Sequence, residues 1–329
     1  KYLIYYQMKK IKSLIRLLIF IIPKTVIAFK YDLFRWLRFS LRDSDRITKQ
    51  QRQAKLLLNL HALEKGLSFP DPREGWGYQK AFLLSKYTHK YITDCGIDDL
   101  ARLSVGVLDA FINDPLTGKS ETLIHNVELL KQIGIEKKDL IGGVKFVQKD
   151  LINFNFQELY NVASLRSSVR HYSEKDITSQ EIENAVKYAQ TAPSVCNRQA
   201  CKIHVFSDNF NDILDVQLGN QGWAHKANKL FVVTADLNFF GSVYERNQPY
   251  IDGGMFAMQF VMGMHVQKIA TCCKMYIRKP DLDKKFYIVT DIPKNEIPIM
   301  LILAGNYSDE IIKVPHSYRF SSTNRTVNH

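Results

Sequence analysis

Two short polar stretches decide how this chain folds: RSSVR at residues 166–170 and PSVCNRQ at residues 193–199. Between them, Thr178-Ser179-Gln180-Glu181 has a capping-box pattern, and apolar residues at helical spacing follow it, so the connection is predicted to be one helix. Arginine offers a fork of charged donors and serine adds a hydroxyl, which suits the first stretch to an anion such as a phosphate. Small polar donors and an amide pair suit the second stretch to the edge of a flat heterocycle.

In this order and one helix apart, the two stretches resemble the flavin-binding signature of the nitroreductase family. The resemblance implies an FMN-dependent oxidoreductase with an α+β fold, a sheet flanked by helices. It implies that the FMN phosphate and ribityl end is held by Arg166, Ser167, Ser168 and Arg170. It implies that the isoalloxazine is met by Pro193, Ser194, Asn197 and Gln199. The family usually continues with Gln-Pro-Trp, whereas this chain has Gln199-Ala200-Cys201.

A third part of the resemblance lies near the C-terminal end of the sequence. Pro315-His316-Ser317-Tyr318-Arg319 is similar to a closing family segment in which Ser-x-Arg adds a second cation to the phosphate. Ser317 and Arg319 are therefore expected to join the cofactor site, although Ser-x-Arg alone is also typical of an ordinary basic tail. Cys196 is expected to line the substrate pocket, and its alternative role is that of a small buried hydrophobe.

The segment from Tyr250 to Val266 is predicted to be a long apolar helix with small residues, and Ile269–Cys273 a strand after it. In the family the corresponding helix lies at a dimer interface, so the resemblance implies a homodimer with FMN between the subunits. Many members have a glycine-containing turn after the strand. This chain has Lys274-Met275-Tyr276 at that place, where a backbone N–H would still be available.

The composition excludes several classes of protein. The chain has 329 residues, of which 46% are hydrophobic and 12% aromatic, so it can bury a sizeable core. Residues 1–65 contain 15 basic and 4 acidic side chains and so carry +11 of the net charge of +12. The rest is nearly neutral, which argues against nucleic-acid binding. The five cysteines form no C-x-x-C pair, so we expect reduced thiols, a cytoplasmic location and no metal site.

The basic N-terminal stretch is apolar as well as cationic. Its longest uncharged run, Leu17–Pro23, is shorter than the roughly 20 residues that span a bilayer. Residues 9–39 are therefore expected to lie along the inner membrane surface, with basic groups on anionic lipid. The alternatives are a helix packed on the body or on a partner subunit, and a signal peptide. Met8, which begins Met-Lys-Lys-Ile-Lys, is a candidate initiator.

Three regions are expected: a basic amphipathic segment over residues 1–50, a helical extension over 51–160, and a nitroreductase-like FMN-binding domain over 161–329. Strands are predicted at Lys202–Phe206, Leu230–Ala235 and Pro298–Ala304. His61-Ala62-Leu63-Glu64-Lys65-Gly66-Leu67 resembles a segment of nitroreductase-like proteins that carry an N-terminal extension, some of them associated with bacterial surface-polysaccharide genes. One interpretation places His61, Glu64 or Lys65 over the flavin, and the favoured one is a helix end capped by Gly66.

The resemblance implies a hydride transfer in ping-pong order, from NAD(P)H through FMN to a small-molecule acceptor that the sequence does not identify. No side chain is assigned as catalytic, because the cofactor performs the chemistry and the protein positions it. The alternative function is a membrane-associated flavin-binding protein of surface-polysaccharide assembly that has lost turnover. The departures at Gln199-Ala200-Cys201 and Lys274-Met275-Tyr276 motivate it.

Overall fold

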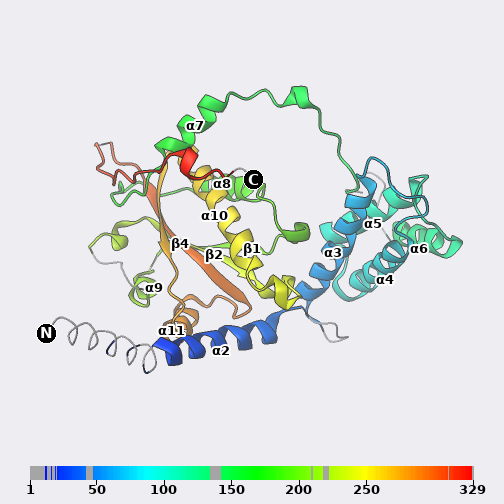
Figure 1. Cartoon of the computed structure of the whole chain (residues 1–329), viewed down its shortest axis with the longest axis horizontal. Coiled ribbons are helices and arrows are strands. Elements are labelled where there is room, and N and C mark those ends of the chain that lie inside the picture. Colours follow the sequence, from blue (N-terminus) through cyan, green and yellow to red (C-terminus); the bar gives the residue numbers. More distant parts are fainter. Residues whose placement is uncertain are drawn as a thin grey trace.

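The computed structural model describes residues 12, 16, 19, 21–41, 47–133, 142–208, 210–217, 222–309 and 311–327. The candidate initiator Met8 and the basic residues Lys9 and Lys10 lie outside the described residues. Within these ranges the fold is α+β. Helices come first along the chain, and an antiparallel sheet with flanking helices makes up the C-terminal half (Figure 1).

Four strands form an antiparallel sheet in the order β1-β2-β4-β3. Their bounds are Cys201–Phe206 for β1, Lys229–Asp236 for β2, Ile269–Met275 for β3 and Glu296–Asn306 for β4. The strands predicted at Lys202–Phe206, Leu230–Ala235 and Pro298–Ala304 are confirmed with ends that differ by one or two residues. β3 extends two residues beyond its prediction, so Lys274 and Met275 end a strand instead of opening a loop.

Both faces of the sheet are covered, which explains why β2 is buried along its whole length. Leu230 and Val232 pack with α9 (Asn211–Asp215) and α11 (Pro280–Thr290) on one face. Phe231 and Val233 pack with α8 (Ser179–Ala189) and α10 (Gln248–Val266) on the other. This alternation is the period of two that side chains follow along a strand. A run of apolar residues is therefore required here, because no face of β2 meets water.

The predicted capping box at the start of α8 is present. The Thr178 hydroxyl accepts from the Glu181 backbone N–H at 3.2 Å, and the Glu181 carboxylate accepts from the Thr178 backbone N–H at 2.8 Å. α8 packs along α10, where Gly263 allows the close approach. A Cβ on Gly263 would lie 2.9 Å from the Ala185 Cα. The cap and the glycine contact together fix the helix that separates the two polar stretches.

A second, purely helical core lies beside the sheet. Its helices are α3 (Lys49–Leu67), α4 (Tyr78–Cys95), α5 (Asp99–Asn113) and α6 (Glu121–Gln132). α3 continues through Gly66 and is capped at Ser68, so the prediction that Gly66 caps the helix is wrong. Gly66 is required for packing instead, because a Cβ there would lie 2.1 Å from the Trp76 ring. α3 also packs on the short helix η4 (Val195–Asn197), which belongs to the second polar stretch.

The N-terminal helix α2 (Ile22–Phe39) is anchored to the body by one face. Arg35 pairs with the fully buried Asp283 of α11 at 2.5 Å, and Tyr31 donates to the same carboxylate at 2.7 Å. Trp36 is buried in the helical core. The interpretation of this segment as a helix packed on the body is thus confirmed for its second half. None of the described helices combines the length and the apolar character that crossing a bilayer requires.

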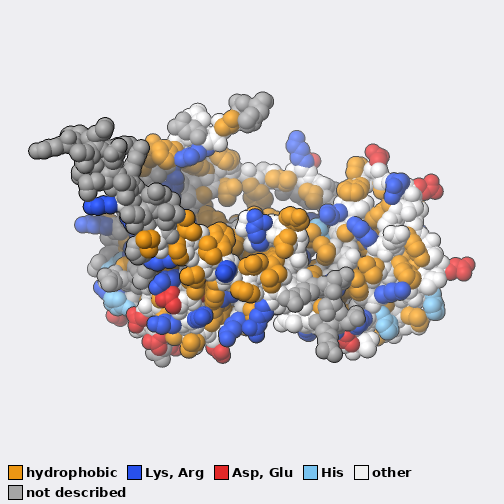
Figure 2. All heavy atoms as spheres, turned by 60° about the horizontal axis from the view of Figure 1, so that its bottom comes forward, with side chains coloured by type: hydrophobic (Ala, Val, Ile, Leu, Met, Phe, Trp, Pro, Cys, Tyr) orange, Lys and Arg blue, Asp and Glu red, His pale blue; other side chains and the backbone are white. Residues whose placement is uncertain are grey.

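The opposite face of α2 remains exposed and apolar. Figure 2 shows hydrophobic side chains interspersed with Lys and Arg on the side of the molecule that carries this helix. The exposed apolar residues of this outer face are Ile22, Ile27, Phe34 and Leu37. An amphipathic helix is typically apolar toward the core, so an apolar face on the solvent side indicates a surface for contact.

Two further segments extend along the outside of the molecule. Residues 142–155 arc away from the helical core and lead to α7 (Phe156–Leu165), which lies at the far end of the sheet (Figure 1). Phe154 and Phe156 are 89% and 76% exposed, and α7 buries none of its residues. Residues 311–327 likewise expose Ile311, Tyr318 and Phe320. The remaining short helices are η3 (Lys149–Leu151), η5 (Ala224–Lys226), η6 (Leu237–Phe239), η7 (Val243–Glu245) and η8 (Ser322–Asn324).

Candidate functional site

The first polar stretch and the C-terminal Ser-x-Arg meet in one cavity. Arg166 is the residue that caps the C-terminal end of α7, and Ser167 follows it. Together with Ser317 and Arg319 they line a cavity of about 390 Å³. Its other lining residues are Tyr160, Ala163, Ser164, His316 and Tyr318. The structure thus brings together two guanidinium groups and two hydroxyls that lie about 150 residues apart in the sequence.

The backbone of the first stretch is held by the edge strand β3. Ser168 forms a parallel bridge with Thr271, and the Val169 N–H donates to the Thr271 carbonyl at 3.0 Å. The buried Tyr172 hydroxyl then donates to the Val169 carbonyl at 2.9 Å. These bonds extend the sheet by one short segment and fix the register of the residues on either side of Val169. Arg166 and Ser167 therefore stand at the open end of a fixed backbone.

Arg170 is directed elsewhere. Its guanidinium lies 5.3 Å from the centre of the Trp223 ring, and the Lys274 ammonium lies 5.4 Å from that ring. Burial raises the pKa of the nearby Cys272 thiol, while the charges of Arg170, Lys274 and Arg166 partly offset that rise. Arg170 is thus not among the residues that line the Arg166 cavity, although it contributes to the positive potential beside it.

The second polar stretch has an unusual backbone. Cys196, Asn197 and Gln199 have φ values of 50°, 50° and 51°, in the left-handed region that residues with a Cβ rarely adopt. Among the described residues only six non-glycine residues have positive φ, and half of them stand in this one loop. Such conformations cost free energy and persist where the surroundings impose them, often at binding sites.

Asp252 of α10 is one of the groups that impose this conformation. It is buried, its Oδ2 accepts from the Val195 N–H at 3.2 Å, and its Oδ1 accepts from Gln248 at 2.7 Å. Within the loop, the Ser194 hydroxyl accepts from the Gln199 N–H at 3.1 Å. One carboxylate oxygen therefore ties the loop to the long helix, the other is held within that helix by Gln248, and the Ser194 hydroxyl braces the loop internally.

Arg198 is the second anchor of the loop. Only 2% exposed, it donates to the Phe239 carbonyl at 2.7 Å and pairs with Glu245 at 2.6 Å. Burial opposes the charge on Glu245, but hydrogen bonds from Arg198 and from the backbone N–H of Gly241 lower the pKa of that carboxyl. Arg198 thus anchors the loop to the protein interior, and its guanidinium is not available to a ligand.

Pro193, Ser194 and Gln199 line a second, smaller cavity of about 100 Å³ with Asp252 and Phe256. Cys196 is half-buried and Asn197 is exposed, and neither lines this cavity. The second cavity shares no lining residue with the one around Arg166. Within one chain, the two predicted ends of the cofactor site are thus separate cavities.

Three residues that support or line the site are not predicted as site residues from the sequence. Asp252 lies within the segment predicted as a long apolar helix, and its bond to the Val195 N–H cannot be foreseen without the fold. Arg198 has no role in the family resemblance, although its place between the two predicted contact residues Asn197 and Gln199 is a signal. Tyr160 stands one helical turn before Ser164 and lines the first cavity with it. The described residues contain no group of three or more His, Cys, Asp or Glu side chains placed to hold a metal ion.

Comparison with known proteins matches a family model described as the nitroreductase family to residues 163–214. No curated protein matches the chain. Among solved structures, a nitroreductase family protein from Streptococcus pneumoniae TIGR4 is 17% identical, with 52% of this chain and 100% of that chain covered and a TM-score of 0.44. A nitroreductase family protein from Clostridium difficile 630 is 21% identical, with 53% and 98% covered and a TM-score of 0.42.

A third solved structure is a putative nitroreductase in complex with FMN from Desulfovibrio desulfuricans. It is 14% identical, with 52% of this chain and 96% of that chain covered and a TM-score of 0.43. The stretch matched by the family model contains both polar loops, α8 and β1. Over residues 163–214, this chain is similar to the nitroreductase family.

Proposed function

We propose that this protein is an FMN-dependent oxidoreductase of the nitroreductase type, which takes hydride from NAD(P)H and delivers it to a small-molecule acceptor. The observation that carries the proposal is the cavity formed by Arg166, Ser167, Ser317 and Arg319, because its first two residues lie in the stretch matched by the family model. When bound, FMN supplies the redox centre, and the chain supplies the groups that hold and orient it.

The donors of the first cavity fit a phosphate monoester. Two guanidinium groups remain charged at every physiological pH and can each form two parallel hydrogen bonds to phosphate oxygens. The Ser167 and Ser317 hydroxyls add two further donors of the kind that phosphate accepts. We assign Ser168 and Arg170 to the same end of the cofactor, Ser168 through its backbone position and Arg170 through its charge.

The isoalloxazine end is proposed to lie on the second loop. Pro193, Ser194, Asn197 and Gln199 are its cofactor contacts, and Cys196 faces the substrate. The left-handed residues of the loop support this assignment, since Asn197 and Gln199 are exposed on a backbone that Asp252 and Arg198 hold in place. A loop that is fixed before the ligand arrives loses less conformational entropy on binding.

A homodimer is proposed to bring the two cavities together, one from each subunit, with both subunits lining each FMN site. α10 presents an exposed face with Ile251 and Met258, 53% and 49% exposed, and Gly254 between them has open space around it. The exposed apolar residues of 142–165 and 311–327 are further surfaces that a partner would cover. Isologous contacts of this kind are typical of symmetric dimers.

Flavin titration of matched arginine variants tests the assignment. Arg166→Ala and Arg319→Ala are each expected to weaken FMN binding by about tenfold or more, because each removes a charge-assisted hydrogen bond. Arg325→Ala is the control, because it removes an exposed arginine six positions from Arg319 that does not line the cavity. Equal FMN affinity in all three variants, or no FMN binding by the parent protein, would contradict the proposal.

A membrane-surface contact is proposed for residues 9–39, on the cytoplasmic side. It is supported by the outer face of α2, whose exposed apolar residues stand among Lys24, Lys30 and Arg38. Co-sedimentation with vesicles tests it. Binding to vesicles that contain anionic lipid, with loss in Phe34→Asp, supports the contact, and equal recovery in the supernatant with and without vesicles contradicts it.

A flavin-binding protein without turnover, in surface-polysaccharide assembly, is the second candidate function. It is favoured by β3, which continues through Lys274 and Met275 where the family often has a glycine-containing turn. The two candidates differ in one measurement: bound FMN that neither NADH nor NADPH reduces would favour the second.

A further inference from the structure

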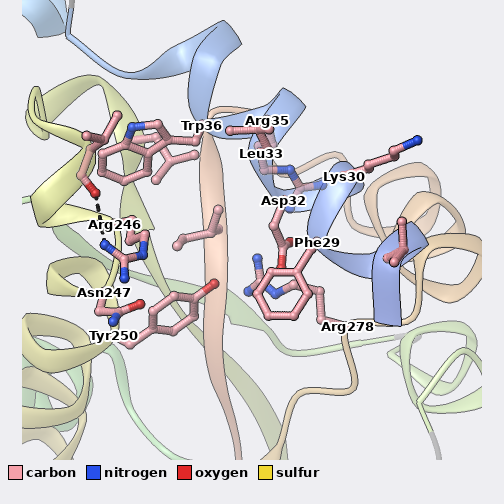
Figure 3. Close-up of a pocket in the computed structure, with 14 residues that line it drawn as sticks. Phe29, Lys30, Asp32, Leu33, Arg35, Trp36, Arg246, Asn247, Tyr250 and Arg278 are labelled. Atoms are coloured by element: carbon pink, nitrogen blue, oxygen red, sulfur yellow. Dashed lines mark hydrogen bonds between the residues drawn. The ribbon is translucent and has the colours of Figure 1, made fainter. Parts of the chain in front are cut away.

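A feature that the flavin site does not use is a cavity of about 490 Å³ between α2 and the body. This volume lies in the range that small-molecule sites occupy in proteins. Figure 3 shows the side chains of α2 on one side of the cavity and those of η7 and α10 on the other. Lining residues come from α2, η6, η7, α10, β4 and the connection between β3 and α11, so segments distant in sequence close around it.

The floor and the rim of this cavity are apolar. Trp36, Leu237 and Ile297 are buried below it, and Val26, Phe29, Leu33 and Val243 remain substantially exposed at its edge. Exposed side chains of this size favour an occupant that removes them from water, at about 25 cal/mol per Å² of apolar surface. The walls therefore suit a flexible alkyl chain or another slender apolar group.

The polar groups of the cavity are mainly cationic. Lys30, Arg246 and Arg278 line it, together with Asp32. Burial raises the pKa of Asp32, and the charge of Arg278 opposes that rise, so these two groups offset each other. Arg35 also lines the cavity but is paired with Asp283.

Arg246 is the cation best placed for a ligand. Its Nη1 donates to the Val243 carbonyl at 3.4 Å, a contact drawn in Figure 3, and its other N–H groups point into the space beside Asn247 and Tyr250. Among the described residues, neither Arg246 nor Lys30 stands within ion-pair distance of a carboxylate. An apolar channel that ends at a guanidinium without an acidic partner is complementary to an anion on an apolar tail.

We propose that this cavity binds a single-chain amphiphile with an anionic headgroup, the headgroup on Arg246 and the chain along Val26, Phe29, Leu33 and Trp36. Phosphate and carboxylate headgroups share the required chemistry. The position of the cavity under α2, whose outer face is apolar, places its entrance beside the surface from which such a molecule would be taken. The inference stands apart from flavin binding, because the cavity shares no lining residue with either flavin loop.

Isothermal titration calorimetry of the full chain with dodecyl phosphate, below its micellar concentration, tests the proposal. We expect one molecule bound per chain, with dodecanoate, dodecyl maltoside and inorganic phosphate as comparison ligands. Binding of dodecyl phosphate or dodecanoate at least tenfold tighter than of the neutral maltoside and of inorganic phosphate supports the proposal, and the stronger of the two anions identifies the headgroup. Equal binding of the maltoside, equal binding of inorganic phosphate, or no binding of either anion overturns it.

Two pairs of variants distinguish binding in the cavity from binding to the outer face of α2. Val26→Trp fills the cavity and is expected to weaken binding at least tenfold, whereas Ile27→Trp, on the next residue and outside the cavity, leaves it unchanged. Arg246→Ala is expected to weaken the anionic ligands but not the maltoside, and Arg325→Ala to change neither. Equal effects within either pair overturn the proposal.

The same variants distinguish other occupants and the flavin site. Loss of self-association in Val26→Trp alone, measured by sedimentation, would assign the cavity to a partner chain and so overturn the proposal. FMN affinity, measured on every variant, shows whether a substitution affects only the amphiphile cavity or also the flavin site. Unchanged FMN affinity with altered amphiphile binding is the expected result, and a failure of FMN binding by the parent protein leaves the calorimetric test intact.

Discussion

Arg198 and Glu245 form a two-point ion pair, with Nη2 2.6 Å from Oε1 and Nη1 3.1 Å from Oε2. Arg198 stands near the end of the second polar loop, and Glu245 stands in η7, next to Arg246 of the cavity under α2. The same carboxylate accepts from the backbone N–H of Gly241 and Ser242. One buried arginine therefore connects the loop proposed for the flavin ring to a wall of the amphiphile cavity.

Arg198→Ala is expected to destabilise the protein and to weaken FMN binding together. Removing one partner of a buried pair costs about 3–5 kcal/mol, and the partial exposure of Glu245 places the expected loss near 2–3 kcal/mol. Without this anchor, the left-handed residues of the loop are free to relax. Urea denaturation and FMN titration measure the two effects. Arg198→Ala with parent-like FMN affinity would show that the loop is held by Asp252 alone.

Glu296 makes the stability of the sheet depend on pH. Burial opposes its charge, but hydrogen bonds from His204, Lys202 and Thr234 lower the pKa of Glu296 to about 2. An unfolded glutamate titrates near 4.3, so this group stabilises the fold fully above about pH 4.5 and loses the effect as the pH falls toward 2. The shift corresponds to about 3 kcal/mol.

Thermal or urea unfolding between pH 7 and pH 2.5 checks this expectation. The parent protein should lose stability steeply below pH 4.5. Glu296→Gln should be less stable at pH 7 and show a shallower decline, because it has no carboxylate to protonate. Parallel pH profiles for the two proteins would mean that other carboxylates dominate the acid response.

Gly253 and Gly254 of α10 form a matched pair with opposite expectations. A Cβ at Gly253 would lie 2.7 Å from Ile299 Cγ1, whereas Gly254 has no atom within 4 Å of its would-be Cβ. Gly253→Ala is therefore expected to destabilise the fold by about 1–3 kcal/mol through overpacking. Gly254→Ala should be neutral or slightly stabilising, because alanine favours a helix. Differential scanning calorimetry compares them, and an equal loss in both would contradict this packing.

Ile251→Asp tests the proposed subunit interface. The side chain is exposed on α10, so a charge there should leave the folded monomer intact. In a dimer that buries this face, an unpaired carboxylate would weaken association strongly. Sedimentation velocity should show dimers for the parent protein and monomers for the variant. A parent protein that remains monomeric at high concentration would remove the basis for an intersubunit FMN site.

Arg35→Ala tests how α2 is attached. Its partner Asp283 is fully buried and also accepts from Tyr31 and from Tyr276, so removing Arg35 leaves a buried carboxylate without its cation. Limited proteolysis should then cut within α2 much faster than in the parent. Arg38→Ala, one turn closer to the helix end and exposed, is the control. Equal protection in both variants would mean that Trp36 and its apolar contacts suffice.

The strands and α10 were predictable because their apolar runs are long and bounded by turn residues. β2 illustrates this, because a strand that is buried on both faces needs apolar residues at successive positions. The Arg166 cavity was predictable only through the family resemblance, because Arg319 and Arg166 line it from positions far apart in the sequence, which no local pattern encodes. The end of α3 was mispredicted at Gly66 because a glycine required by the Trp76 ring has the same sequence signature as a helix cap.

The most direct test of the account is the visible absorbance spectrum of the purified protein supplied with FMN, recorded before and after anaerobic addition of NADPH or NADH. We expect flavin absorbance that stays with the protein through gel filtration and bleaches with at least one nucleotide. A protein that emerges colourless after incubation with FMN would contradict the cofactor site built on Arg166 and Arg319. Retained flavin that neither nucleotide bleaches would contradict the proposed turnover.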